Sequence, residues 1–398
     1  MSTLRYSKRF YAGLIISVCL SMIAVDSMIP ALPQIAAGLG VSQGDAPLLI
    51  TTYLLGYASA QIPVGLLSDR YGRRHVLLIG LLVFEATAFA VVWAPTLEFF
   101  LVARFLMGVA GATGPVVGRA VLRDTHEGIE LGRVMALLVA VLAAGTMLAP
   151  LSGTLLVMFI GWHAPLWVPI VVTAAALLLV FFSVPESHTP DRDLGLIRQI
   201  TSSARMFLSS RQACWGTMML GAAFFGFFGI TGLMGSVFVE YFALDPDLVG
   251  WFFTGAAAFY MCGGILCRRL LSSLDPVVVA GYSVGAFALA LCLSLLSLLQ
   301  YRLQGDFSLA LFATCIALYF VALGLVFAPS TTIALQPVPS IAGFGASVLG
   351  SFQMGMGTMG TWIGSVVYDG TPAPILYLML AAVLTISCLW FARFKLLA

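Results

Sequence analysis

Long apolar runs follow one another along this chain and decide what it can fold into. A helix needs about 20 apolar residues to cross about 30 Å of bilayer hydrocarbon. Soluble domains are about 45–50% apolar and about 25% charged, whereas this chain of 398 residues is 61% hydrophobic and 9% charged. With Gly, Pro and charge clusters as boundaries, the sequence predicts an all-α membrane protein with twelve transmembrane helices over 10–37, 46–66, 75–94, 98–119, 131–158, 164–183, 213–238, 248–267, 276–299, 307–330, 336–366 and 373–392.

The longest hydrophilic stretch, residues 185–212, divides these helices into six and six. This predicts an N-terminal half over 1–184, a cytoplasmic linker over 185–212 and a C-terminal half over 213–398. Cytoplasmic loops of membrane proteins are enriched in Lys and Arg. If the N-terminus is cytoplasmic, every Lys and Arg except Arg104 and Arg302 falls at a cytoplasmic position. We therefore expect both termini in the cytoplasm and a multi-pass protein of a bacterial inner membrane.

The composition also argues against several classes of function. A net charge of +2 provides no basic surface for nucleic acid, and the seven cysteines lie in or beside apolar runs without metal-site spacing. No Gly-x-x-x-x-Gly-Lys-Ser/Thr loop is present for ATP. The acidic residues near the cytoplasmic side lie among arginines and form no cluster suited to Mg²⁺ and diphosphate. We expect no metal, no cofactor and no enzymatic activity.

One short loop gathers charge in this apolar chain: "GLLSDRYGRR", from Gly65 to Arg74. Its pattern resembles the loop between helices 2 and 3 of the major facilitator superfamily, a family of twelve-helix transporters. The resemblance implies that Asp69 closes the cytoplasmic side by pairing with Arg119 or Arg123 and facing the helix that begins near Gly343. The gate residues implied in this way are Gly65, Asp69, Arg70, Gly72, Arg73, Arg119 and Arg123. A channel would not need such a loop.

Three further patches are similar to the Bcr/CflA-type drug:proton antiporters of that superfamily. The first helix contains "DSMIPALPQIA", with Met28 where the family has tyrosine, and the fourth contains "RFLMGVAGATGPVVGRAVLRD". The fifth contains Gly145, Ala149, Pro150 and Gly153, which resemble the antiporter motif except that Ala149 replaces a glycine. The resemblance implies export of a small compound in exchange for protons.

Few ionisable residues lie where the sequence places lipid. A charge at the bilayer centre costs about 2.5–3.5 kcal/mol even on the mildest scale. Asp26 lies deep in the first predicted helix and Arg104 about six residues into the fourth. Asp26 is our candidate for the group that takes up and releases the proton, with Arg104 biasing its pKa; a fixed ion pair between the two helices is the alternative. Glu85, in the third helix, is either a second proton site or a neutral side chain bonded to Thr87 or to a neighbouring helix.

The helices of the C-terminal half have no charged residue in their central parts but many aromatic and Met side chains, which suit varied apolar ligands. The residues expected at the substrate cavity are Met28, Phe224, Phe228, Gln353 and Met354. We expect a monomer whose partners are a small molecule, protons and membrane lipid. The leading hypothesis is a proton-coupled antiporter that exports lipophilic or amphipathic compounds such as drugs; export of an endogenous metabolite or siderophore by the same mechanism is the alternative.

Overall fold

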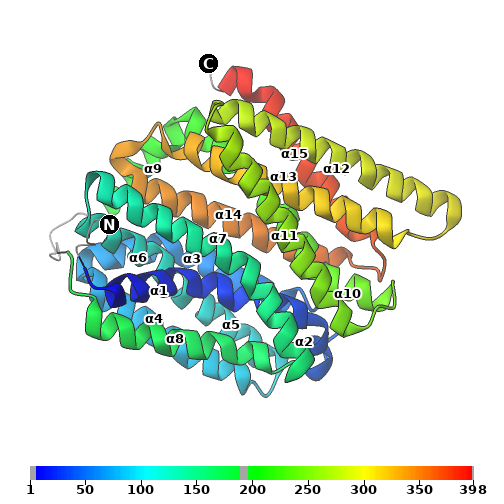
Figure 1. Ribbon diagram of the computed structural model, residues 1–398, viewed down its shortest axis with the longest axis horizontal. Coiled ribbons are helices and arrows are strands. Elements are labelled where there is room, and N and C mark those ends of the chain that lie inside the picture. The colour runs from blue at the N-terminus through cyan, green and yellow to red at the C-terminus, as the bar shows by residue number, and fades with distance from the viewer. Residues whose placement is uncertain (1–5, 189–195, 397–398) are drawn as a thin grey trace. The chain divides into compact units, whose positions relative to one another are not determined.

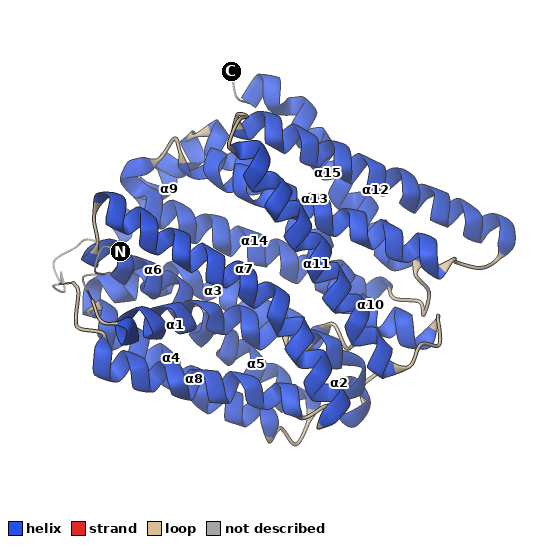
Figure 2. Ribbon diagram, in the orientation of Figure 1, coloured by secondary structure: helices blue, strands red, loops and turns tan. Residues whose placement is uncertain are grey.

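The computed structural model describes residues 6–188 and 196–396, and within these ranges all regular structure is helical (Figures 1 and 2). Two short 3₁₀ turns, η1 (Ile29–Ala31) and η2 (Pro339–Ile341), accompany the α-helices. The helices are α1 (Lys8–Asp26), α2 (Leu32–Gly38), α3 (Leu48–Tyr71), α4 (Arg73–Val92), α5 (Leu97–Gly111), α6 (Thr113–Thr125), α7 (Gly128–Phe159), α8 (Ala164–Ser183), α9 (Leu196–Ser209), α10 (Arg211–Glu240), α11 (Pro246–Leu271), α12 (Pro276–Gln304), α13 (Leu309–Leu335), α14 (Ala342–Val367) and α15 (Ala373–Leu396).

The twelve predicted transmembrane segments correspond to these helices, with α1 and α2 forming the first segment and α5 and α6 the fourth. Among the described residues, nine segments are long and apolar enough by composition alone to cross a membrane. The helices α3 and α14 are not among these nine, and α14 is rich in glycine; within α7 the apolar stretch that is counted is the shorter Leu148–Phe159. The helix α9 was not predicted, because it lies within residues 185–212, for which the sequence predicts a polar linker.

The first segment breaks immediately after Asp26. The helix α1 ends there, a 3₁₀ turn follows, and α2 begins at Leu32. Pro30 lies four residues after Asp26, so it has no N–H to offer to the Asp26 carbonyl and its ring would clash with that carbonyl in a continuous helix. The sequence thus places its buried carboxylate at a point where the helix cannot continue.

The fourth segment breaks in the same way. The helix α5 ends at Gly111 and α6 begins at Thr113. Pro115 stands four residues after Gly111, so the same loss of an N–H donor and the same ring clash end α5 at that residue. Both breaks occur in segments that carry a charged residue inside the membrane, Asp26 in one and Arg104 in the other.

The described chain forms two compact units: residues 1–31 with 52–200, and residues 32–51 with 201–398. The first includes α4, α5, α6, α7 and α8 and the second includes α10 to α15. The predicted N-terminal half, 1–184, includes residues 32–51. In the structure these residues pack with the second unit. The Ser236 hydroxyl of α10 donates to the backbone carbonyl of Gln43 at 3.0 Å, and the hydroxyls of Thr51 and Thr361 lie 2.6 Å apart.

In the second unit, α10 packs against α13, α14 and α15 (Figure 1). Glycines permit this close packing, since a Cβ at Gly360 would lie 2.0 Å from the carbonyl oxygen of Phe225. Two large buried polar side chains of this unit find backbone partners: the Trp215 indole N–H donates to the Leu389 carbonyl at 2.8 Å, and the Tyr319 hydroxyl donates to the Ala223 carbonyl at 2.8 Å. Most buried polar groups in proteins are paired in this way, because an unpaired one is costly where water is excluded.

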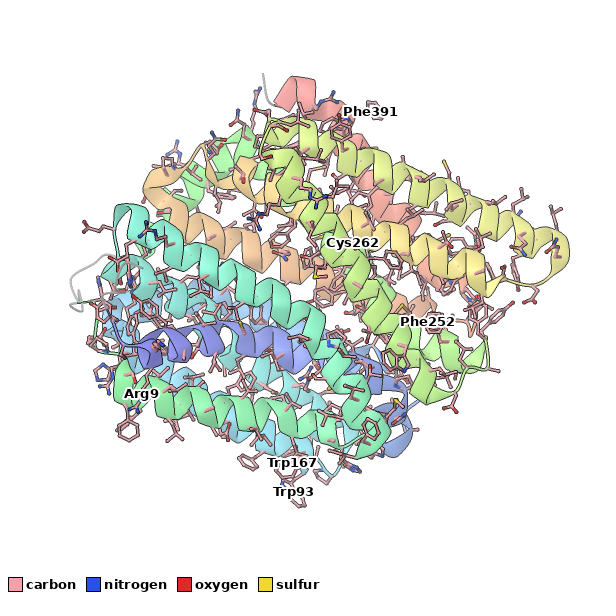
Figure 3. The ribbon with its side chains drawn as sticks, in the orientation of Figure 1. Arg9, Trp93, Trp167, Phe252, Cys262 and Phe391 are labelled. Carbon is pink, nitrogen blue, oxygen red and sulfur yellow. The ribbon has the colours of Figure 1, made fainter. Side chains whose placement is uncertain are left out.

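Large apolar side chains project outward from the helices in both units. Trp93, Trp167 and Phe391 are exposed and point away from the ribbons in Figure 3. Aliphatic side chains such as Ile79 and Leu384 are more than half exposed. A soluble protein would not tolerate apolar surface of this extent, so the side chains that cover these helices suit a lipid surrounding.

Candidate functional site

The predicted proton site, Asp26, is the last residue of α1 and is 7% exposed. No hydrogen bond or ion pair between described residues includes its carboxylate. Burying an ionised carboxylate without a partner is costly. Binding of a proton or approach of a cation would remove that cost, so the charge state of Asp26 depends on which protons and cations reach it. Its neighbour Met28, a predicted cavity residue, is 1% exposed and lies between α1 and η1.

The antiporter motif of α7 packs against the break in the first segment. A Cβ at Gly153 would lie 2.1 Å from the carbonyl oxygen of Ser27, so only glycine allows the two backbones to approach this closely. One turn earlier, Ala149 is 4% exposed and Pro150 is also buried. A Cβ at Gly145, by contrast, would meet no described atom within 4 Å. Only the Gly153 end of the motif therefore sets the distance between α7 and the residue that follows Asp26.

The second buried charge, Arg104, is 1% exposed on α5. Its guanidinium carbon lies 4.6 Å from the centroid of the Tyr53 ring, a cation–π distance, and its Nη1 lies 3.7 Å from the Met107 sulfur. A Cβ at Gly108 would lie 2.1 Å from the Tyr53 carbonyl oxygen, so this glycine lets α5 and α3 meet. The Tyr53 hydroxyl lies 3.5 Å from the Ser21 carbonyl oxygen of α1. Tyr53 thus stands between Arg104 and the first helix.

Arg73 is the centre of the charged cluster at the turn between α3 and α4. The residue is 6% exposed, and its guanidinium pairs with Asp69 four residues earlier. It also donates from Nε to the Asp124 Oδ2 at 3.0 Å and from Nη1 to the Ser68 hydroxyl at 2.6 Å. One arginine therefore joins the end of α3 to the end of α6 through two carboxylates. Hydrogen bonds of this charge-assisted kind are stronger than neutral ones.

This geometry corrects the expected pairing of Asp69. Its predicted partner was Arg119 or Arg123, but Arg73 takes that position. The Arg119 Nε donates instead to the Pro115 carbonyl in its own helix at 2.6 Å, and Arg123 is exposed. The reason is distance along the chain, because a side chain four residues away across a tight turn is already in place. The expected contact of Asp69 with the helix near Gly343 concerns both units and stays a prediction.

Glu186, which follows α8, caps the first turn of α4. Its two carboxylate oxygens accept the backbone N–H of Arg73 at 2.8 Å and of Arg74 at 3.2 Å, and the His75 Nδ1 lies at 3.3 Å. Burial alone would raise the pKa of the Glu186 carboxyl, but these N–H groups outweigh it and hold the pKa below its usual value. Gly72 has a φ of +99°, and a Cβ there would lie 2.6 Å from the Glu186 Oε2. The turn therefore requires glycine for its conformation and for space.

Two other predicted gate residues lie beside this cluster without joining it. The Gly65 carbonyl accepts a hydrogen bond from the Ser68 hydroxyl at 2.7 Å within α3. The exposed Arg70 guanidinium lies 5.6 Å from the centroid of the Tyr71 ring. Arg70 takes part in no ion pair between described residues.

The family to which this chain belongs is shown by its similarity to known proteins. The profile of the Major Facilitator Superfamily matches residues 14–361. The chain belongs to this superfamily. It is 27% identical over 363 residues to the bicyclomycin resistance protein homolog of Haemophilus influenzae, with 90% of this chain and 89% of the relative covered. It is 26% identical over 399 residues to multidrug resistance protein D of Escherichia coli, with 94% and 93% covered.

Solved structures of other transporters have the same fold. The human organic anion transporter MFSD10 superposes with a TM-score of 0.66 at 18% identity, covering 98% of this chain and 99% of that one. A bacterial homolog of the human lysosomal transporter Spinster superposes with a TM-score of 0.69 at 14% identity, covering 99% and 97%. At such identities the likeness concerns the fold alone. It confirms the predicted fold class, the all-α major facilitator fold of a membrane transporter.

In this member of the superfamily, Glu85 lies near the middle of α4 and is partly buried. Its Oε2 is buried and has no hydrogen-bond partner among the described residues. The suggested bond to Thr87 is wrong, because the Thr87 hydroxyl donates to the Val83 and Phe84 carbonyls of its own helix. Whether Glu85 carries a proton during transport stays a prediction.

The predicted cavity residues of the second unit do not share one environment. Phe224 is 5% exposed and belongs to an aromatic cluster in which its ring centroid lies 6.0 Å from that of Phe327 on α13. Phe228 is also 5% exposed, and it packs where a Cβ at Gly357 of α14 would approach its ring to 2.4 Å. Phe228 therefore fills a helix–helix contact. Gln353 is 7% exposed, and Met354 is half-buried on α14.

Sequence reasoning missed two residues of the site, Tyr53 and Glu186. Tyr53 looks like any tyrosine in an apolar helix, and nothing in its own surroundings in the sequence marks it as the neighbour of Arg104. Glu186 lies in a polar stretch that reads as linker, more than one hundred residues from the turn that it caps. Gly72 is among the predicted gate residues, but the side chain that packs against it, Glu186, comes after the end of α8 and is far away in the sequence.

Proposed function

We propose that this superfamily transporter exports small lipophilic compounds in exchange for protons, across the inner membrane of a bacterium. The names of its relatives support the cargo class, since a bicyclomycin resistance protein homolog and a multidrug resistance protein match about nine-tenths of the chain. The apolar and aromatic surface of the second unit supports it as well, because a sugar or a dianion would need more polar and charged side chains. The chain contains no asparagine.

The buried carboxylate of Asp26 is the single observation that supports proton coupling most directly. It lies in a membrane-spanning segment, at a helix break, with no hydrogen-bond or ion-pair partner among the described residues. Intramembrane carboxylates that face such sites are characteristic of proton relays. Uptake of a proton would remove the cost of the buried charge, and release would restore it. Arg104 would influence this exchange through Tyr53, whose ring it contacts and which reaches towards α1.

The arginine-rich turn between α3 and α4 would form part of a cytoplasmic gate. By the positive-inside rule this end of the helices faces the cytoplasm, and both termini lie on the same side. Arg73, Asp69 and Asp124 would hold α3, α4 and α6 together as one body while the transporter changes state. Rigid-body movement of two bundles is the usual mode of alternating access in this class of transporter. In this proposal, residues 1–184 and 213–398 act as the two halves, linked by 185–212.

The test is Asp26→Asn, which keeps the size of the side chain and removes its ionisation. Inverted membrane vesicles energised with a pH gradient should accumulate a lipophilic dye with the wild-type protein and only at background level with the variant. Glu127→Gln, which removes an exposed carboxylate without a capping hydrogen bond, is the matched control and should transport normally. Cargo-dependent proton release at the wild-type rate in the Asp26→Asn vesicles would show that the proton is carried elsewhere.

A further inference from the structure

A cavity of about 310 Å³ lies within the second unit, between α10, α11 and α13. None of the residues predicted for the substrate cavity lines it. Ligand pockets in proteins begin at about this size and are lined mainly by apolar and aromatic side chains. The ten residues of the lining are all apolar: Met234, Phe238, Trp251, Phe252, Gly255, Ala256, Phe259, Ala313, Ile316 and Ala317.

The cavity exists because two helices that touch at one level separate at another. At the level of Gly263 on α11, a Cβ would lie 2.1 Å from the Val321 carbonyl oxygen of α13. A Cβ at Gly324 of α13 would lie 2.3 Å from the Tyr260 carbonyl oxygen, so the two helices are in backbone contact there. Two turns away along α11, a Cβ at Gly255 would meet no described atom within 4 Å. The small residue at position 255 therefore leaves space instead of closing a helix contact.

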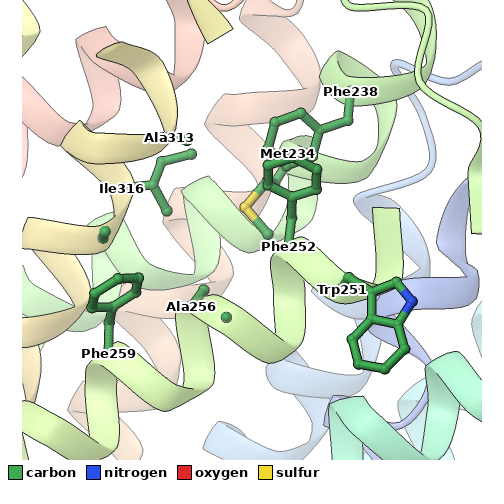
Figure 4. Close-up of a pocket in the computed structure, with 10 residues that line it drawn as sticks. Met234, Phe238, Trp251, Phe252, Ala256, Phe259, Ala313 and Ile316 are labelled. Carbon is green, nitrogen blue, oxygen red and sulfur yellow. The ribbon is translucent and has the colours of Figure 1, made fainter. Parts of the chain in front are cut away.

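Aromatic rings and a thioether surround this space (Figure 4). Met234 and Phe238 of α10 are almost fully buried and form one wall. The ring centroids of Phe238 and Phe252 lie 4.4 Å apart. Trp251 and Phe259, from two different turns of α11, stand at opposite ends of the lining and are about half exposed. Flat π surfaces and a polarizable sulfur favour a flat, polarizable ligand.

We propose that this cavity binds the aromatic ring system of an uncharged, lipophilic cargo molecule. The assignment rests on the proposed export function and names the class of compound that the site accepts. A compact ring system of about two fused or linked rings suits a cavity of this size with rings on several sides. No charged side chain lines it, and the Trp251 indole N–H is the one hydrogen-bond donor among the lining side chains, so a charged group of the cargo would have to remain outside it.

The test measures binding to the purified full-length protein in detergent, with N-phenyl-1-naphthylamine as the probe. This uncharged aromatic accepts excitation energy from tryptophan, and saturable binding is expected in the wild type. Gly255→Leu and Ala313→Leu fill the cavity from opposite walls, and each should raise the Kd of the probe by about tenfold or more. Gly264→Leu is the matched control, because it lies on the same helix, faces open space and does not line the cavity. Its Kd should equal that of the wild type.

The outcomes separate the possible occupants and the two proposals. An unchanged Kd in both filled variants overturns the site, and so does an equal loss of binding in the Gly264→Leu control. Displacement of the probe by palmitate as effectively as by biphenyl overturns the aromatic assignment, because the occupant is then an acyl chain. The detergent assay has no proton gradient, so it is independent of Asp26. Wild-type vesicles that accumulate no dye under a pH gradient would refute the proposed function while leaving this site unaffected.

Discussion

The two units of this transporter differ in where they hold charge. In the first, Arg73 joins two carboxylates at the end of the helices, and Asp26 and Arg104 are buried inside them. At the end of α11 in the second unit, Arg268 and Arg269 are exposed, and no described carboxylate lies within ion-pair distance of either. The spanning helices of that unit have apolar middles. The comparison teaches that proton chemistry and cargo recognition can be divided between the units, because the same interior cannot easily be both charged and lipophilic.

The largest difference in stability between the two units is expected when one arginine is removed from the predicted cytoplasmic end of each, Arg73 at the start of α4 and Arg268 at the end of α11. Arg73→Ala should lower the free energy of unfolding by about 2 kcal/mol, since it leaves Asp69 and Asp124 together without their shared cation. Arg268→Ala should change it by less than about 0.5 kcal/mol because that side chain is exposed. Thermal unfolding of both purified variants in the same detergent checks the pair. Equal losses of stability in the two variants would mean that the ion pairs of Arg73 do not stabilise the first unit.

A smaller effect is expected at the cap of α4. Glu186→Gln should cost about 1 kcal/mol at neutral pH, because it removes the carboxylate that accepts two N–H groups of the first turn. The folded-state pKa of Glu186 lies below its usual value. Its contribution is therefore complete above the usual carboxyl pKa and is lost as the pH falls through the lowered one. The wild type and Glu186→Gln should accordingly differ in stability at neutral pH and converge in acid.

Glu127→Gln is the control for that prediction. Glu127 also precedes a helix, α7, but its side chain makes no capping hydrogen bond. Its substitution should leave the pH profile of stability unchanged. A difference between wild type and Glu186→Gln that persists at the lowest pH tested would contradict the electrostatic explanation of the cap.

The smallest effect is expected at Glu85. Glu85→Gln keeps the shape of the side chain in the middle of α4, and proton-driven transport should change by less than about twofold if Asp26 is the sole proton carrier. Transport into inverted vesicles, measured beside Asp26→Asn, checks this. A loss as complete as that of Asp26→Asn would show that the first unit contains two proton sites, and would sharpen its contrast with the second unit.

The sequence predicted the helices well, because lipid requires every spanning segment to be long and apolar and to keep its charges at its ends. It did not predict where segments break, although Pro30 and Pro115 each mark a break four residues upstream. The amphipathic helix α9 was also missed. Its apolar residues, among them Ile200 and the buried Phe207, recur at helical spacing within a stretch that reads as linker.

The site was less accessible to sequence reasoning than the fold. Asp26 and Arg104 stand out because charge is rare in apolar helices, and both are buried. The ion-pair partner of Asp69 was assigned wrongly, since a family resemblance names candidates but does not measure which one is nearest. Glu186 and Tyr53 contact residues that are distant in the sequence, Arg73 and Arg104, and no local sequence pattern predicts such contacts. The cavity between α11 and α13 depends on how far two helices diverge, which composition does not determine.

The helices α11 and α13 are in backbone contact at Gly263 and are separated by the cavity at Gly255. Gly263 places no side chain of its own between the two backbones, so this contact can serve as the point about which one helix tilts on the other. Gly255 lies eight residues further along, a lever of about 12 Å, so a tilt of about 5° would alter the opening there by about 1 Å. Cargo rings of different thickness could then be held by the same walls at little energetic cost. Breadth of cargo would in that case come from backbone geometry rather than from flexible side chains.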